Sequence, residues 1–175
     1  MKPHTLALNG CVLAAMAALF AACSKPAPQD RIVKADTAYQ FDQWRTDRDD
    51  WSPREQQDFD TAIQEIKLDV MNKSAGTMDS RESAMLEIVK GKTVRAVDII
   101  GWHDRRDRLD REKKDMETRY AHDSKLAVRE DQADRAQTLA AITRNQQAII
   151  AKNTGLIADV DAKLQIWESG ASAAK

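Results

Sequence analysis

The spacing of hydrophobic positions along the chain predicts a series of helices. One apolar stripe, with spacings of four, three and four residues, runs along a helix expected over about 53–73 and consists of Phe59, Ile63, Ile66 and Val70. A shorter helix over about 80–90 offers Met85, Ile88 and Val89. A group of aromatic residues upstream is expected to cap a small core: Tyr39, Phe41, Trp44 and Trp51.

Three helix starts carry the capping-box signature, in which a side chain accepts from an unpaired backbone N–H and a second side chain reaches back. The three pairs are Thr37 with Gln40, Ser52 with Glu55, and Asp79 with Glu82. Pro53 also stands at the favoured first helical position. These signals predict a small helical region over 36–102.

The segment after residue 102 changes character. It holds no glycine or proline up to residue 154, and residues 103–135 are mostly charged. Several acidic residues are followed four positions later by a basic residue, an order that stabilises an exposed helix. These pairs are Asp104–Arg108, Asp107–Arg111, Asp110–Lys114 and Asp115–Arg119. The segment is either part of one rod on the order of 110 Å long, or an arm of a hairpin that turns near His122, Asp123 and Ser124.

The C-terminal part has a heptad-like seam in steps of three and four residues, typical of coiled coils. The seam is Leu139, Ile142, Gln146, Ile149, Asn153, Leu156, Val160 and Trp167, with Lys163 as its weak position and with Ile150, Ile157 and Leu164 on one flank. Gln146 and Asn153 are polar residues at core positions, which fix register at a cost in stability. Three uses stay open: packing on its own chain, self-association, or binding another envelope protein.

The fold class predicted from these patterns is all-α. Short helices precede a long charged helix or helical hairpin over 103–168, whose C-terminal part resembles a coiled coil. Residues 169–175 are expected to form a flexible tail.

The N-terminus carries a targeting signal. Residues 6–22 are almost wholly apolar, which is typical of a secretory signal peptide over 1–22. "LFAAC" resembles a bacterial lipobox, so we expect lipid attachment at Cys23, with ordinary secretion as the alternative. Ser24 then implies the periplasmic face of the outer membrane, and residues 23–35 are predicted to be a lipidated tether. Two or three acyl chains, at roughly 0.8 kcal/mol per buried methylene, suffice for stable attachment.

Composition narrows the function. Cys11 and Cys23 are the only cysteines, so the mature chain has no disulfide framework. The formal net charge of −1 comes without a basic or acidic tail, so no nucleic-acid partner is indicated. No small-molecule substrate is evident from the sequence either.

The tripeptide Gly91-Lys92-Thr93 is how a phosphate-binding loop ends, but such a loop needs a glycine where Leu86 stands. Gly91 is expected to be a helix C-terminal glycine and Thr93 the next N-cap. His103 and His122 each precede an aspartate in the charged segment and are expected to be solvated. We therefore predict no catalytic residue, metal or cofactor, and no enzyme activity.

The segment 36–101 resembles a family of small bacterial lipoproteins of unknown function. The matching positions are Ser52, Glu55, Phe59, Ala62, Gly91, Lys92, Thr93, Val94, Val97 and Ile99. The resemblance implies a lipoprotein of small helices and no known activity, and the charged extension after residue 103 departs from it.

The function expected from these features is that of a membrane-anchored, non-catalytic scaffold or protein-interaction module. One alternative is a structural spacer joined to peptidoglycan through Lys175, since murein lipoproteins also end in a lysine. The other is a tethered inhibitor or chaperone-like binder.

Overall fold

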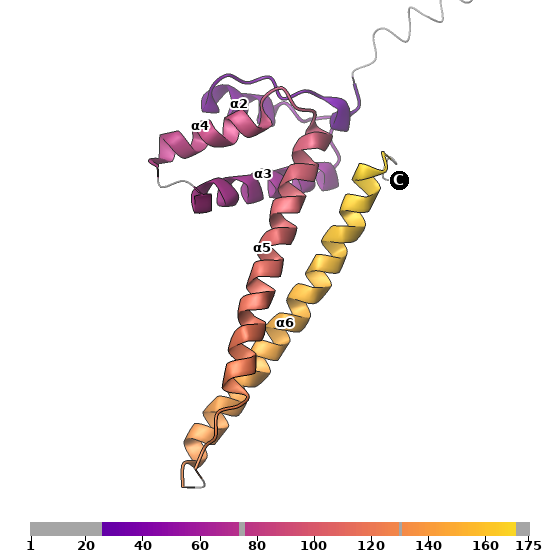
Figure 1. Ribbon diagram of the computed structural model, residues 1–175. Helices are drawn as coiled ribbons and strands as arrows, with labels where there is room; N and C mark the ends of the chain where they lie inside the picture. The colour runs from indigo at the N-terminus through magenta and orange to yellow at the C-terminus, as the bar shows by residue number, and fades with distance from the viewer. Residues whose placement is uncertain (1–25, 74–75, 130, 171–175) are drawn as a thin grey trace, which may run out of the picture.

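The computed structural model describes residues 26–73, 76–129 and 131–170, and these form an all-helical structure (Figure 1). The elements are the 3-10 turn η1 (Pro28–Asp30) and the α-helices α2 (Ala38–Thr46), α3 (Pro53–Lys73), α4 (Met78–Val89), α5 (Val94–Asp123) and α6 (Ala133–Glu168). The predicted all-α class is confirmed. The predicted signal peptide, Cys23 and Lys175 lie outside the described residues.

Two parts share one long helix. The helices α2, α3 and α4 and the start of α5 form a head, and α5 and α6 form a hairpin that projects from it (Figure 1). The 30 residues of α5 span about 45 Å at 1.5 Å per residue. The hairpin alternative is therefore confirmed and the single rod is wrong. The expected boundary at residues 102 and 103 is also wrong, because α5 runs across it.

The helix starts follow the predicted capping chemistry in two of three cases. The Thr37 hydroxyl accepts from the Gln40 N–H at 3.2 Å. Ser52 Oγ accepts from the Glu55 N–H at 3.2 Å, and Glu55 Oε2 accepts from the Ser52 N–H at 2.8 Å. The prediction for Asp79 is wrong: α4 begins after Thr77, whose hydroxyl accepts from the Ser80 N–H. Asp79 instead lies in the first turn, where its charge favours the helix N-terminus.

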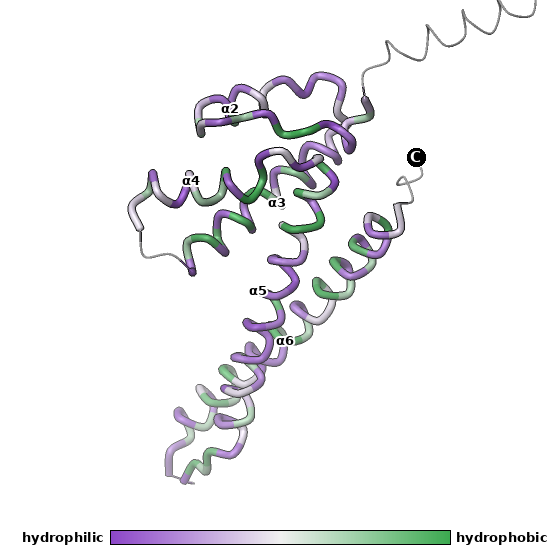
Figure 2. The backbone as a smooth tube through the Cα atoms, turned by 45° about the horizontal axis from the view of Figure 1, so that its top comes forward, coloured by the Kyte–Doolittle hydropathy of each residue, from purple (hydrophilic) through white to green (hydrophobic). Residues whose placement is uncertain are grey.

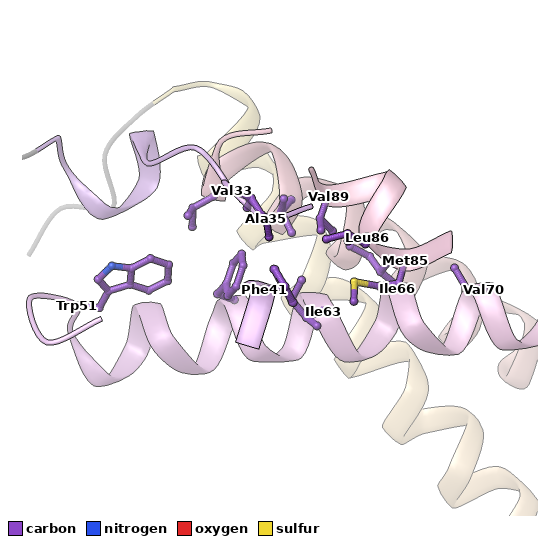
Figure 3. Packing of buried hydrophobic residues seen from close by; sticks show 13 residues of the cluster. Val33, Ala35, Phe41, Trp51, Ile63, Ile66, Val70, Met85, Leu86 and Val89 are labelled. Carbon is purple, nitrogen blue, oxygen red and sulfur yellow. The ribbon is translucent and has the colours of Figure 1, made fainter. Parts of the chain in front are cut away.

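The core of the head lies between α3 and α4, as Figure 3 shows. The predicted stripe is buried: Phe59, Ile63, Ile66 and Val70 are all under 7% exposed. Met85 and Val89 meet it from α4, and Phe41 and Trp51 close one end. Tyr39 does not join them, contrary to prediction. It is 71% exposed because its ring points off α2, where its hydroxyl accepts from the Gln43 amide at 2.9 Å.

Residues 28–35, here called the strap, pack on the head instead of forming a tether. The Val33 N–H donates to the Lys92 carbonyl at 2.9 Å, and the Gly91 N–H donates to the Val33 carbonyl at 3.0 Å. Val33 is 1% exposed and Ala35 is 5% exposed, so both belong to the core. The prediction of a flexible tether is therefore wrong for these residues, because β-like pairing and two small apolar side chains hold them to the turn before α5.

Candidate functional site

The hairpin is an antiparallel pair, and its polar contacts set the register. Gln146 Nε2 donates to Asp123 Oδ2 at 2.6 Å, near the hairpin turn. At the other end, Arg106 Nε donates to Asp161 Oδ1 at 2.6 Å. The seam of α6 thus packs against α5 of the same chain, which is the first of the three uses that the sequence left open.

The seam residues differ in their burial. Gln146, Asn153 and Val160 are buried, and Leu139, Ile149, Leu156 and Trp167 are partly buried. Ile142 is 44% exposed, so its predicted place in the seam is wrong. The reason is that α5 ends at Asp123, opposite Gln146, and the first turns of α6 lie beyond that end.

The two amides of the seam are buried with polar atoms that have no hydrogen-bond partner among the described residues. These atoms are Gln146 Oε1 and Asn153 Nδ2. An unmatched buried donor or acceptor costs about 1–3 kcal/mol. The amides therefore weaken the hairpin, while the bond from Gln146 to Asp123 fixes its register.

The last turns of α6, residues 160–168, dock on the head and are here called the α6 end. The Trp102 and Trp167 rings meet edge to face with centroids 5.9 Å apart. The Lys163 ammonium lies 4.0 Å from the Trp102 ring centroid and donates to the Asp58 carboxylate of α3. Lys163, the weak position of the predicted seam, thus ties α6 to α3, and Val160 and Leu164 share a buried cluster with Ala62 of α3.

A buried carboxyl lies behind this contact. Asp98 of α5 is 5% exposed, and its Oδ1 has no hydrogen-bond partner among the described residues. Burial raises the pKa of Asp98 to about 8, and the neighbouring charge of Asp58 acts in the same direction. Asp98 lines a cavity of about 50 Å³ together with Trp51, Asp58 and Trp167. The only signal for it in the sequence is an aspartate placed among apolar residues in "AVDII".

A second charged cluster ties α5 to α3. Glu65 is 4% exposed, and its carboxylate accepts three hydrogen bonds of 2.6–3.0 Å from the Arg105 and Arg108 guanidinium groups. The hydrogen bonds to Glu65 raise the pKa of Arg108. The sequence predicted Asp104 as the partner of Arg108, and this is wrong. Because Arg108 binds Glu65 of α3 instead, α5 is less exposed here than its many charges predicted.

The phosphate-loop tripeptide is a joint between helices, as predicted. Gly91 has a φ of 72°, in the left-handed region that glycine adopts without strain. The Thr93 hydroxyl accepts from the Ala96 N–H at 3.2 Å and so caps α5. The strap closes over the same turn.

Both histidines lie beside carboxylates on exposed surface. His103 Nε2 is 2.8 Å from Glu168 Oε1, and His122 Nδ1 is 3.0 Å from Asp123 Oδ1. Over 26–73, 76–129 and 131–170, no three histidine, cysteine or acidic residues are grouped as a metal would require. In the same ranges, no helix combines the length and apolar character needed to cross a bilayer.

Comparisons with known proteins add no relative. No family model, no curated protein and no solved structure matches this chain. The resemblance to small bacterial lipoproteins therefore stays a prediction.

Proposed function

We propose that this protein is a lipid-anchored envelope lipoprotein whose head stays beside the membrane while its hairpin projects away as a non-catalytic interaction arm. The observation that carries the proposal is the placement of the two described ends. Arg95 Nη2 donates to Gln29 Oε1 of the strap at 3.0 Å, and a Cβ added at Gly170 would lie 3.7 Å from Arg95 Nη1. Both ends therefore lie at the head, opposite the hairpin turn (Figure 1).

The strap supports a short connection to the membrane. If Cys23 carries the lipid, only four residues lie between it and Pro28, where the strap begins, so five Cα–Cα steps join the two. A fully extended chain of five residues spans at most about 18 Å. The head would then stay close to the bilayer, and the hairpin turn would lie roughly 45 Å farther out along α5.

The hairpin turn offers the surface for a partner. Because α5 of the same chain covers most of the seam, we place the surface for a partner outside the seam, at the hairpin turn. Leu126 is 43% exposed in the turn and Ile142 is 44% exposed in the adjoining part of α6. Figure 2 shows apolar segments in this part of the chain, whereas α5 is mainly hydrophilic. The partner is another envelope protein or a second copy of this chain, at the periplasmic face of the outer membrane.

The same geometry disfavours the structural spacer. Gly170 lies beside Arg95 in the head, so the length of the hairpin does not separate the lipid anchor from Lys175. The tethered inhibitor or chaperone-like binder would use the same exposed apolar residues as a scaffold and would differ from it only in what it binds.

Two experiments test the proposal. For the anchor, intact-mass analysis is expected to show acyl chains on Cys23, and Cys23→Ser is expected to release the protein from membranes. An unmodified cysteine, or membrane retention of the serine variant, would refute the anchor. For the arm, pull-downs from solubilised envelopes compare Ile142→Asp with Ile166→Asp, which alters an exposed isoleucine (39%) at the head end of α6. We expect only Ile142→Asp to lose the captured partner. Equal capture by both variants would refute the role of the hairpin turn.

A further inference from the structure

We propose that a groove between α3 and α4 binds a fatty acid, that is, one acyl chain that ends in a carboxylate. The helix α3 ends and α4 begins at the same end of the head, where the groove lies between them (Figure 1). Its volume is about 230 Å³, and it is lined by Lys67, Met71, Met78, Arg81 and Glu82. This site is independent of the lipid anchor and of the partner of the hairpin turn.

The walls of the groove suit a narrow apolar ligand. Met71 is 49% exposed and Met78 is 78% exposed, and unbranched methionine side chains adapt their shape to what they contact. The stems of Lys67 and Arg81 add methylene groups to the walls. A water molecule takes about 30 Å³ of liquid and a methylene group is of similar size. The groove therefore has room for about eight methylenes, which is one acyl chain.

Two cations at the groove lack an anionic partner. Within 26–73, 76–129 and 131–170, the side chains of Lys67 and Arg81 form no ion pair and no hydrogen bond. Arg81 Nε is buried without a hydrogen-bond partner in the same ranges. Glu82 is the single acid in the lining, so the lining keeps a net positive charge. A carboxylate can accept hydrogen bonds from a guanidinium, so the head group of a fatty acid complements Arg81 while its chain fills the groove.

The helical walls favour an acyl chain over a peptide segment. Within a helix, the backbone N–H and C=O groups bond to one another, so α3 and α4 present mainly side chains to the groove. A peptide that entered would bury its own backbone polar groups without partners, which is costly. An acyl chain carries no polar group along its length and avoids this cost.

Methionine-methyl NMR of the full chain tests the ligand. Titration with decanoate is expected to shift the methyl signals of Met71 and Met78, while Met116 of α5 serves as a reference that stays unchanged. Affinity is expected to rise by up to about fourfold per methylene from hexanoate to decanoate, and then to level off once the groove is full. Decyltrimethylammonium has a chain of the same length and a positive head group, so we expect it to bind about tenfold more weakly.

Three matched variants test the charges. Arg81→Gln is expected to weaken decanoate binding about tenfold, because it removes a charged hydrogen-bond donor. Glu82→Gln is expected to strengthen binding by about threefold, because it removes a like charge. Lys152→Gln removes an exposed cation of α6, outside the groove, and is expected to leave binding unchanged. All three residues are at least partly exposed, so these variants keep the core intact.

Three outcomes would overturn the proposal. They are unchanged Met71 and Met78 signals in decanoate, equal affinity for decyltrimethylammonium, and native affinity for decanoate in Arg81→Gln. A chain that binds no decanoate but loses a captured envelope protein on Met71→Asp would assign the groove to a protein partner, and would overturn it too.

Discussion

The close crossing of α3 and α5 predicts that replacing Gly101 with alanine lowers the stability of the fold. A Cβ built on Gly101 would lie 2.4 Å from both the Cα and the carbonyl oxygen of Ala62, which are backbone atoms and cannot rotate away. Gly101→Ala therefore has to push the two helices apart. Overpacking of this kind typically costs about 1–3 kcal/mol, with rigid backbone at the upper end. The better helix propensity of alanine returns about 1 kcal/mol, so we expect a net loss of about 2 kcal/mol.

The matched control is the same substitution on α6. A Cβ on Gly155 would meet nothing within 4 Å, so Gly155→Ala has only the propensity gain of about 1 kcal/mol. For a chain of this size, 1 kcal/mol shifts the melting temperature by about 2–4 °C. Thermal unfolding followed by circular dichroism is expected to show Gly101→Ala lower by about 4–8 °C and Gly155→Ala higher by about 2–4 °C. A Gly101→Ala variant as stable as the native chain would refute the close crossing.

Two further substitutions probe the charged and polar contacts of α5. Glu65→Gln removes the carboxylate that Arg105 and Arg108 share, and because both arginines are partly exposed we expect a loss of about 3 kcal/mol, the low end for breaking a buried ion pair. Urea unfolding measures it against Glu112→Gln, which alters a more exposed partner of Arg108 and is expected to cost under about 1 kcal/mol; equal costs would contradict the role of Glu65. Asn153→Leu removes a buried unpartnered donor and is expected to raise stability by about 1–3 kcal/mol without changing the sedimentation coefficient, because α5 of the same chain faces it. A change of oligomeric state would instead favour self-association through the seam.

Local signals in the sequence predicted the local structure well. The caps at Thr37, Ser52 and Thr93 depend on residues three positions apart, so the chain that forms the helix also contains its partner. The stripe from Phe59 to Val70 depends only on helical periodicity. The turn at Gly91 depends on the conformational freedom of one residue.

The candidate site was harder to predict because it depends on which helices cross. Arg108 stands four residues after Asp104, yet its guanidinium turns to Glu65, 43 residues earlier in the chain. Lys163 interrupts the seam by spacing, but it reaches Asp58 on α3. The strap begins with Pro28 and follows Pro26, a composition typical of a tether, yet it pairs with residues 91–94. Each of these contacts joins segments far apart in sequence, and no local period encodes them.

The way α5 is used explains how so charged a helix becomes the structural centre of the molecule. Its first turns put Val94 and Val97 into the core of the head, and its middle is held to α3 through Gly101 and Glu65. Its later turns pack against α6 as far as Asp123, which binds Gln146. After Gly101, α5 contains no glycine or proline that would introduce a kink. The hairpin turn is therefore fixed in direction relative to the head, which is what the scaffold role that we propose would require of the arm.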